Sequence, residues 1–134
     1  MKKGHLTIEN KPSKSDIDNF VKNKPKGLPE DYVNFISENY YTTGDIPLNP
    51  FYFRLWSVDK VLGVNEDYEI QQYMPNYFGI GDQGGGEFLA IDLRDHKIYV
   101  IPFAPMDEED RIFCFENFKE FKDNMGFVAD EPKP

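Results

Sequence analysis

A run of nine residues from Gly79 to Glu87 constrains most strongly what this chain can fold into. It reads Gly-Ile-Gly-Asp-Gln-Gly-Gly-Gly-Glu and holds five of the ten glycines in the chain. Glycine reaches backbone conformations of positive φ without the steric cost of a Cβ atom, and it allows other groups to approach the backbone closely. The run therefore predicts either a tight turn or a backbone site for a ligand.

The run contains the spacing G-x-G-x-x-G, which is the dinucleotide-binding fingerprint when a helix follows it. Here the next residues, Phe88 to Leu93, form a short apolar stretch that is typical of a strand, so no helix N-terminus is available for a pyrophosphate. Asp82 and Glu87 would also place negative charge beside the phosphates. The other motifs of a Walker loop or a protein kinase are missing. The pattern favours a structural turn between two strands.

The composition predicts a globular protein. A chain of 134 residues can form one domain with its own core, and an aromatic content of 16% supplies large apolar side chains. No apolar stretch approaches the roughly 20 residues that span a bilayer, and the N-terminus has no apolar signal core. The single cysteine, Cys114, lies between two phenylalanines and fits a buried residue in a reducing compartment. We therefore expect a cytoplasmic protein that does not bind a membrane.

Charge narrows the class of partner. The chain carries 15 basic and 24 acidic residues, a formal net charge of −9. This excess argues against nucleic acid as the main partner. Seven of the basic residues lie within residues 1–26, so the rest of the chain is the acidic part. An acidic surface would attract a basic protein and raise its association rate.

Hydrophobic periodicity and capping signals predict the elements. Four helices are expected: one capped by Ser15, one opening at Leu28–Tyr32, one from Val58 to Gln72, and one capped by Asn117. Strands are expected over 51–55, 76–80, 87–93 and 97–102, with the last three forming a meander. Residues 40–45 and the acidic run 107–110 are predicted to be loops. The organisation is a polar leader over 1–12, a single domain over 13–126 and a flexible tail over 127–134.

Five short motifs follow one another along the chain: Leu28-Pro29-Glu30-Asp31-Tyr32, Leu55-Trp56-Ser57-Val58, Asn65-Glu66-Asp67-Tyr68, the run Phe78 to Gly86 with Asp92, and Phe115 to Phe121. Taken in this order, they resemble the SUKH superfamily, whose best known members are bacterial immunity proteins. The similarity covers about residues 13–125, and its specificity comes from the order and spacing of the motifs. One departure is Asn39-Tyr40-Tyr41-Thr42, where family members commonly have an Asn-Gly-Gly-like end to the second helix.

The resemblance implies an α+β fold with a single, mostly antiparallel sheet flanked by about four helices. It also implies a protein without catalytic residues or cofactors, which binds and neutralises a cognate bacterial toxin. A basic nuclease is one candidate for that toxin. The structural motif of the family would comprise Trp56, Asp82, Gly85, Gly86 and Asp92.

Each residue of this motif has an expected structural role. Gly85 and Gly86 would allow the tight turn, with Asp82 accepting hydrogen bonds from backbone amides there. Trp56 would anchor the core or the rim of the sheet. Asp92 alternates with apolar residues in its strand, so it is expected to face outward or to pair locally.

The acidic run Asp107, Glu108, Glu109 and Asp110 is the candidate toxin-binding segment, and a merely solvated loop is the alternative reading. It lacks the spacing of an EF-hand, and His5 and His96 belong to no zinc motif, so we expect no metal site. Two classes of function remain open: an immunity protein, and a general protein-interaction or regulatory module of the same fold. The sequence leaves the oligomeric state open.

Overall fold

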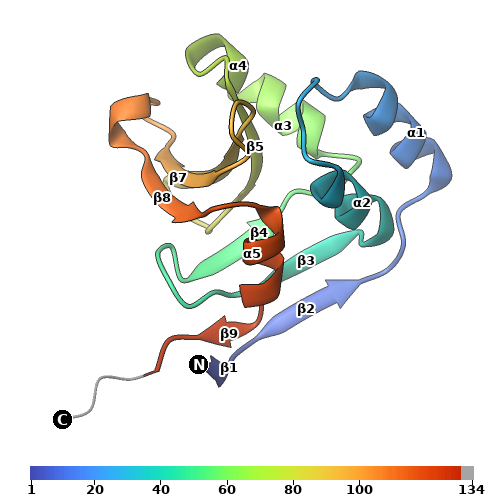
Figure 1. Cartoon of the computed structure of the whole chain (residues 1–134). Helices are drawn as coiled ribbons and strands as arrows, with labels where there is room; N and C mark the ends of the chain where they lie inside the picture. Colours follow the sequence, from blue (N-terminus) through green and yellow to red (C-terminus); the bar gives the residue numbers. More distant parts are fainter. Residues whose placement is uncertain (131–134) are drawn as a thin grey trace.

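The computed structural model describes residues 1–130 and contains a curved, seven-stranded sheet in the order β2-β3-β4-β5-β6-β7-β8 (Figure 1). All neighbouring strands are antiparallel. The strands are β2 (Leu6–Glu9), β3 (Tyr41–Asp45), β4 (Tyr52–Leu55), β5 (Tyr77–Asp82), β6 (Glu87–Asp92), β7 (Ile98–Pro102) and β8 (Ile112–Phe115).

The helices are α1 (Lys14–Asn23), α2 (Glu30–Glu38), α3 (Val61–Asp67), α4 (Ile70–Tyr73) and α5 (Phe118–Asn124), with a short 3-10 helix, η1 (Glu108–Asp110). The α+β fold and the mostly antiparallel sheet are therefore confirmed. The described residues contain five α-helices because Glu69, at φ 55°, interrupts the predicted third helix and separates α3 from α4.

The two faces of the sheet carry separate parts of the core. Along β6, Leu89 and Ile91 point to one face and Phe88 and Ala90 to the other, as the two-residue period of a strand requires. The first face packs under α1, α2 and α5 through Phe20, Tyr32, Ile36, Phe118 and Phe121. The second packs under α4 and the segment after β7 through Ile70, Met74, Phe103 and Met106. This double burial fixes the position of the strands that carry the candidate site.

Both ends of the described chain contain strands that the sequence analysis did not anticipate. Within the expected leader, β2 forms one edge of the large sheet. In addition to the predicted antiparallel sheet, a second, two-stranded sheet pairs β1 (Lys2–Lys3) with β9 (Phe127–Val128) (Figure 1). The last four residues of the expected tail, 131–134, lie outside the described residues.

Two local predictions, on a loop and on a cap, need correction. Residues 41–45 form β3 rather than a loop. Residues 112–115, for which no element was predicted, form the edge strand β8. The first helix is capped by Ser13, whose side chain accepts a hydrogen bond from the Asp16 amide, and not by Ser15. Asn117 caps α5 as predicted, through a 2.8 Å hydrogen bond from the Glu120 amide.

The glycine run joins β5 to β6, as predicted, but its glycines have different tasks. Gly84 has φ +86°, and its amide donates to Asp82 Oδ1 at 2.8 Å, so the turn depends on Gly84 rather than on Gly85 or Gly86. Gly81 lies inside β5, where a Cβ atom would come within 2.4 Å of the Arg54 carbonyl oxygen. The turn and the close contact between β4 and β5 thus account for Gly84 and Gly81.

Candidate functional site

The predicted toxin-binding run lies between β7 and the edge strand β8, and we call Asp107–Asp110 the acidic turn. Asp107 caps the N-terminus of η1, and its Oδ1 accepts a hydrogen bond from the Glu109 amide at 2.9 Å. The Asp110 amide donates to the Asp107 carbonyl at 3.1 Å. A short polar side chain that accepts from the backbone two residues ahead is a typical way to fix such a turn. The acidic turn is therefore an ordered segment.

Beneath the acidic turn lies a group of charged and hydroxyl side chains that we call the arginine cluster: Tyr77, Asp92, Arg94, Glu108 and Arg111. Asp92 ends β6 and its side chain is only 2% exposed. It accepts hydrogen bonds from the Arg94 backbone amide at 2.9 Å, from Nε at 3.0 Å and from Nη2 at 2.9 Å. The prediction of a local partner for Asp92 is confirmed, and the alternative that it faces outward is wrong.

Glu108 attaches the acidic turn to this cluster. Its Oε1 accepts from Arg94 Nη2 at 2.6 Å, from Arg111 Nη1 at 2.7 Å and from the Tyr77 hydroxyl at 2.7 Å. The Tyr77 hydroxyl also accepts from both arginines. The Arg111 guanidinium lies over the Tyr99 ring, 4.5 Å from its centroid. Two arginines and two carboxylates balance in charge, so the cluster holds the turn in place without adding net charge.

The pKa shifts in this cluster favour the charged carboxylates and the neutral phenol. Burial alone would raise the pKa of Asp92, but the hydrogen bonds from Arg94 and the charges of both arginines outweigh it, so that pKa lies below its usual value. The Tyr77 hydroxyl, followed by Arg94, lowers the pKa of Glu108. Burial, helped by the hydrogen bond to Glu108, raises the pKa of Tyr77 to about 12. All three pKa values shift away from neutral pH. A general acid or base requires the opposite, a pKa close to the working pH.

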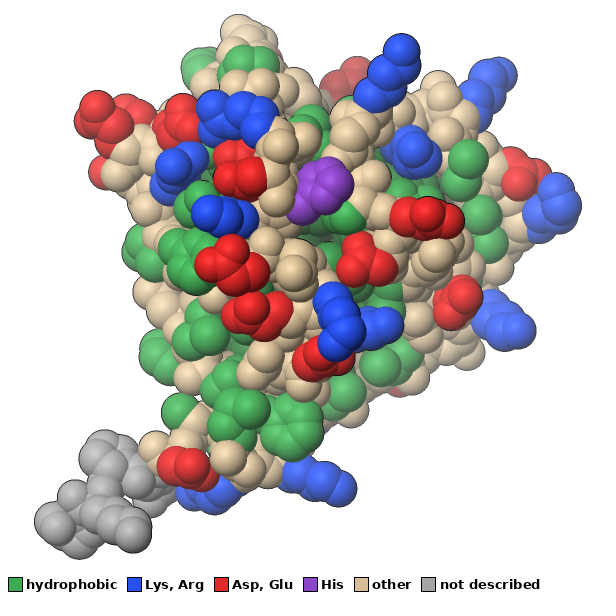
Figure 2. Space-filling view, in the orientation of Figure 1, with side chains coloured by type: hydrophobic (Ala, Val, Ile, Leu, Met, Phe, Trp, Pro, Cys, Tyr) green, Lys and Arg blue, Asp and Glu red, His purple; other side chains and the backbone are tan. Residues whose placement is uncertain are grey.

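The outer side of the acidic turn is different. Asp107, Glu109 and Asp110 are exposed, and none of them forms an ion pair with any residue in the range 1–130. In Figure 2, acidic and basic side chains stand next to one another at the corner of the molecule that carries the acidic turn. The predicted segment thus divides: Glu108 points to the cluster, and the other three carboxylates remain available to a partner.

Exposed apolar side chains follow the turn directly. Ile112 and Phe113 in β8 are 42% and 47% exposed. Phe113 packs edge-on against Tyr99, with 6.0 Å between ring centroids. Within the described residues, β8 pairs with β7 alone and forms the end of the large sheet. Three carboxylates without an ion pair among the described residues, two exposed apolar residues on opposite faces of the sheet and an open strand edge therefore follow one another along the chain, and we call this region the β8 surface.

The residues of the expected family motif lie elsewhere, at the turn between β5 and β6. Trp56 Nε1 donates to Asp82 Oδ2 at 2.8 Å, and Arg54 Nε donates to Asp82 Oδ1 at 2.9 Å. Trp56, Asp82 and Gly85 line a cleft of about 250 Å³, together with Arg54, Val64, Tyr68, Gly84 and Phe103. Asp92, the remaining residue of the motif, belongs to the arginine cluster instead. The importance of these motif residues for the family stays a prediction.

Sequence reasoning missed several residues of the site: Tyr77, Arg94, Arg111, Ile112 and Phe113. A signal for the last two existed, because Ile112 to Phe115 is a run of β-forming residues directly after the acidic run. No comparable signal exists for the arginines, whose role depends on partners up to 34 residues distant in sequence.

A comparison with protein families finds that the model of the SMI1 / KNR4 family (SUKH-1) matches residues 11–124, which is most of the chain. A comparison with curated proteins finds no match. Among residues 1–130, no helix is long and apolar enough to cross a membrane.

Proposed function

We propose, from the premise that the chain belongs to the SMI1 / KNR4 family (SUKH-1), that it is an immunity protein that binds and neutralises a cognate bacterial toxin. One observation supports a particular surface as the binding site for the toxin. Free carboxylates of the acidic turn adjoin exposed Ile112 and Phe113 at an open edge of the sheet. Protein interfaces commonly combine such an apolar centre with a polar rim.

The construction of the β8 surface supports a role in binding. Phe113 is a large aromatic side chain of the kind that contributes strongly to binding free energy when a partner buries it. The edge strand offers backbone donors and acceptors to a strand of the partner. Because the arginine cluster fixes the acidic turn beforehand, less conformational entropy is lost when the turn is bound.

Charge suggests the class of toxin. The net charge of −9 and the free carboxylates of Asp107, Glu109 and Asp110 complement a basic protein. A nuclease with a positively charged phosphate-binding groove is one such partner. Opposite charges would raise the association rate, and blocking the groove would exclude its nucleic-acid substrate. In this proposal the chain acts by occlusion in the cytoplasm and performs no reaction of its own.

The alternative function is a general protein-interaction or regulatory module, and the open edge of β8 is the observation that favours it. An extended peptide of many sequences can add to such an edge through backbone hydrogen bonds. Gene context separates the two functions. A toxin gene with an export domain directly upstream favours the immunity protein, whereas a gene that stands alone favours the module.

Co-expression tests the proposal. The toxin domain encoded next to this protein would be expressed in a sensitive host, with and without the full chain. The proposal predicts that growth is restored and that the two proteins copurify. If growth is not restored and no complex forms, the immunity function is wrong.

A further inference from the structure

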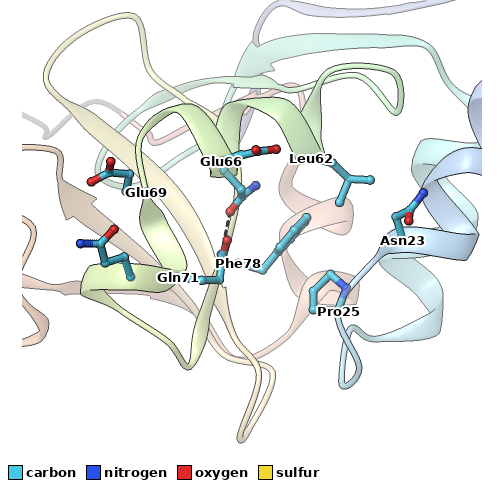
Figure 3. A pocket seen from close by; sticks show the side chains of 9 residues that line it. Asn23, Pro25, Leu62, Glu66, Glu69, Gln71 and Phe78 are labelled. Atoms are coloured by element: carbon cyan, nitrogen blue, oxygen red, sulfur yellow. Dashed lines mark hydrogen bonds between the residues drawn. The ribbon is translucent and has the colours of Figure 1, made fainter.

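A second surface feature lies away from the β8 surface, between the end of α1 and the α3–α4 segment. It is a pocket of about 640 Å³. Figure 3 shows Leu62 of α3 and Phe78 of β5 pointing toward each other, with Asn23 and Pro25 on the α1 side and Glu66 beside Leu62. Phe78 is only 1% exposed, so the accessible apolar side chains of the pocket are Leu62 and Pro25, and the polar part is made of amides and carboxylates.

The first amide, Asn65, directs all its hydrogen-bonding capacity inward. Its Nδ2 donates to the carbonyl oxygens of Val61 and Gly79, both at 2.8 Å. Its Oδ1 accepts from the Gly79 amide at 2.8 Å and from Gln71 Nε2 at 3.0 Å. Asn65 thereby fixes α3 to β5 and forms a rigid wall.

Two other amides of the pocket, Gln71 and Asn23, use their donors but not their acceptors. Gln71 Nε2 donates to Asn65 and also to the Tyr77 carbonyl at 2.8 Å. Asn23 Nδ2 donates to the Asn19 carbonyl at 2.9 Å. Gln71 Oε1 and Asn23 Oδ1 accept no hydrogen bond from any residue that the structure describes. The pocket therefore presents acceptors to a ligand.

Carboxylates add negative charge to these acceptors. Glu66 and Glu69 both line the pocket, are exposed, and form no ion pair with residues in the range 1–130. Lys22, Lys24 and Lys26 belong to the same end of α1, but none of them lines the pocket. A matching ligand has a positive charge, several donors and an apolar stem. Among protein side chains, arginine fits best because its guanidinium carries five N–H donors and no acceptor.

We propose that this pocket binds an arginine side chain of a protein partner, with the aliphatic stem against Leu62 and Pro25 and the guanidinium facing Glu66 and Gln71. The inference rests on the proposed function only in that the partner is a protein. It adds a second point of contact, separate from the β8 surface, and it gives that contact a defined chemistry.

The test titrates the full, isotope-labelled chain with N-acetyl-arginine amide and follows backbone amide resonances. N-acetyl-citrulline amide is the matched probe, because it has nearly the same shape without the charge. We expect shifts centred on Asn65, Gln71 and Gly79, with citrulline binding about tenfold more weakly, as the loss of one charge-assisted hydrogen bond implies. The E66Q variant should weaken arginine binding to a similar degree, and E38Q, an exposed change outside the pocket, should leave it unchanged.

Several outcomes would overturn the proposal: no shifts at these residues, equal binding of arginine and citrulline, or a response to N-acetyl-glutamate amide instead. Free L-arginine binding about tenfold more tightly than the blocked amide would identify a small-molecule pocket and also overturn it. Because no toxin is present, the result does not depend on whether the chain neutralises one.

Discussion

Arg94 and Asp92 are joined by three hydrogen bonds, from the backbone amide, Nε and Nη2 of the arginine to the two carboxylate oxygens of the aspartate. The same guanidinium reaches Glu108 at 2.6 Å. A buried residue at the end of β6 thus determines where the acidic turn lies. The proposed binding surface depends on this link between core and surface.

Replacing Asp92 by alanine should therefore destabilise the fold. The substitution removes the acceptor for three hydrogen bonds and leaves the Arg94 amide without its side-chain partner. We expect a loss of about 1–3 kcal/mol in the free energy of unfolding, measured by urea denaturation. The control is D110A at an exposed site, where a change within about 0.5 kcal/mol is expected. Equal stabilities for the two variants would show that the cluster does not support the fold.

Stability should also fall in acid. The pKa values of Asp92 and Glu108 are lower in the folded chain than in the unfolded one, so both groups stabilise the fold above the unfolded pKa. That contribution is fully present above about pH 5 and is lost as the pH falls through about 4 toward the lowered values. Denaturation of wild type and R94Q across this range measures the effect. The variant should show a flatter decline, and parallel curves would contradict the assignment.

The meander and the helix ends could be predicted because their signals are local. Asn117 caps α5 through an amide three residues away, and the continuous apolar run of residues 88–91 is visible in the sequence itself. The edge strands could not be identified in this way. Leu6–Glu9 becomes a strand through pairing with β3, more than 30 residues later, and its residues carry no strong alternation of burial.

The candidate site was predictable only in part, for the same reason. The acidic run marked the segment, but nothing in its sequence distinguishes Glu108 from its three neighbours. That distinction comes from Arg94 and Tyr77, which lie 14 and 31 positions away. The expectation that Asp92 faces outward failed because alternation indicates the face of a strand but not what covers that face.

The glycine turn offers a test of individual backbone positions. G84A places a side chain at φ +86°, whereas G86A has ordinary φ and open space around it. We expect G84A to cost about 1 kcal/mol of stability and G86A less than half of that, both measured by thermal or urea unfolding. A larger loss of stability for G86A than for G84A would show that the turn depends on Gly86 instead.

Phe113 should matter more for binding than for folding. Because its side chain is 47% exposed, F113A should cost at most about 1 kcal/mol of stability. If a partner buries this ring, the dissociation constant for the toxin domain should rise at least about tenfold, as measured by calorimetry. V21A is the control, because Val21 is 48% exposed on α1, away from β8. If F113A and V21A bind the toxin domain with equal affinity, β8 is not part of the interface.

The most direct test of the proposed surface is the association rate with the toxin domain as a function of salt. The variant D107N/E109Q/D110N removes three free carboxylates but keeps the oxygen of residue 107 that caps the turn. E9Q/E30Q/E38Q makes the same change of charge at exposed sites outside the turn. The acidic-turn variant should associate about tenfold more slowly at low salt and with a weaker salt dependence, while the control stays close to wild type. Unchanged rates for the acidic-turn variant, or equal losses in both variants, would contradict the proposal that the acidic turn binds the toxin.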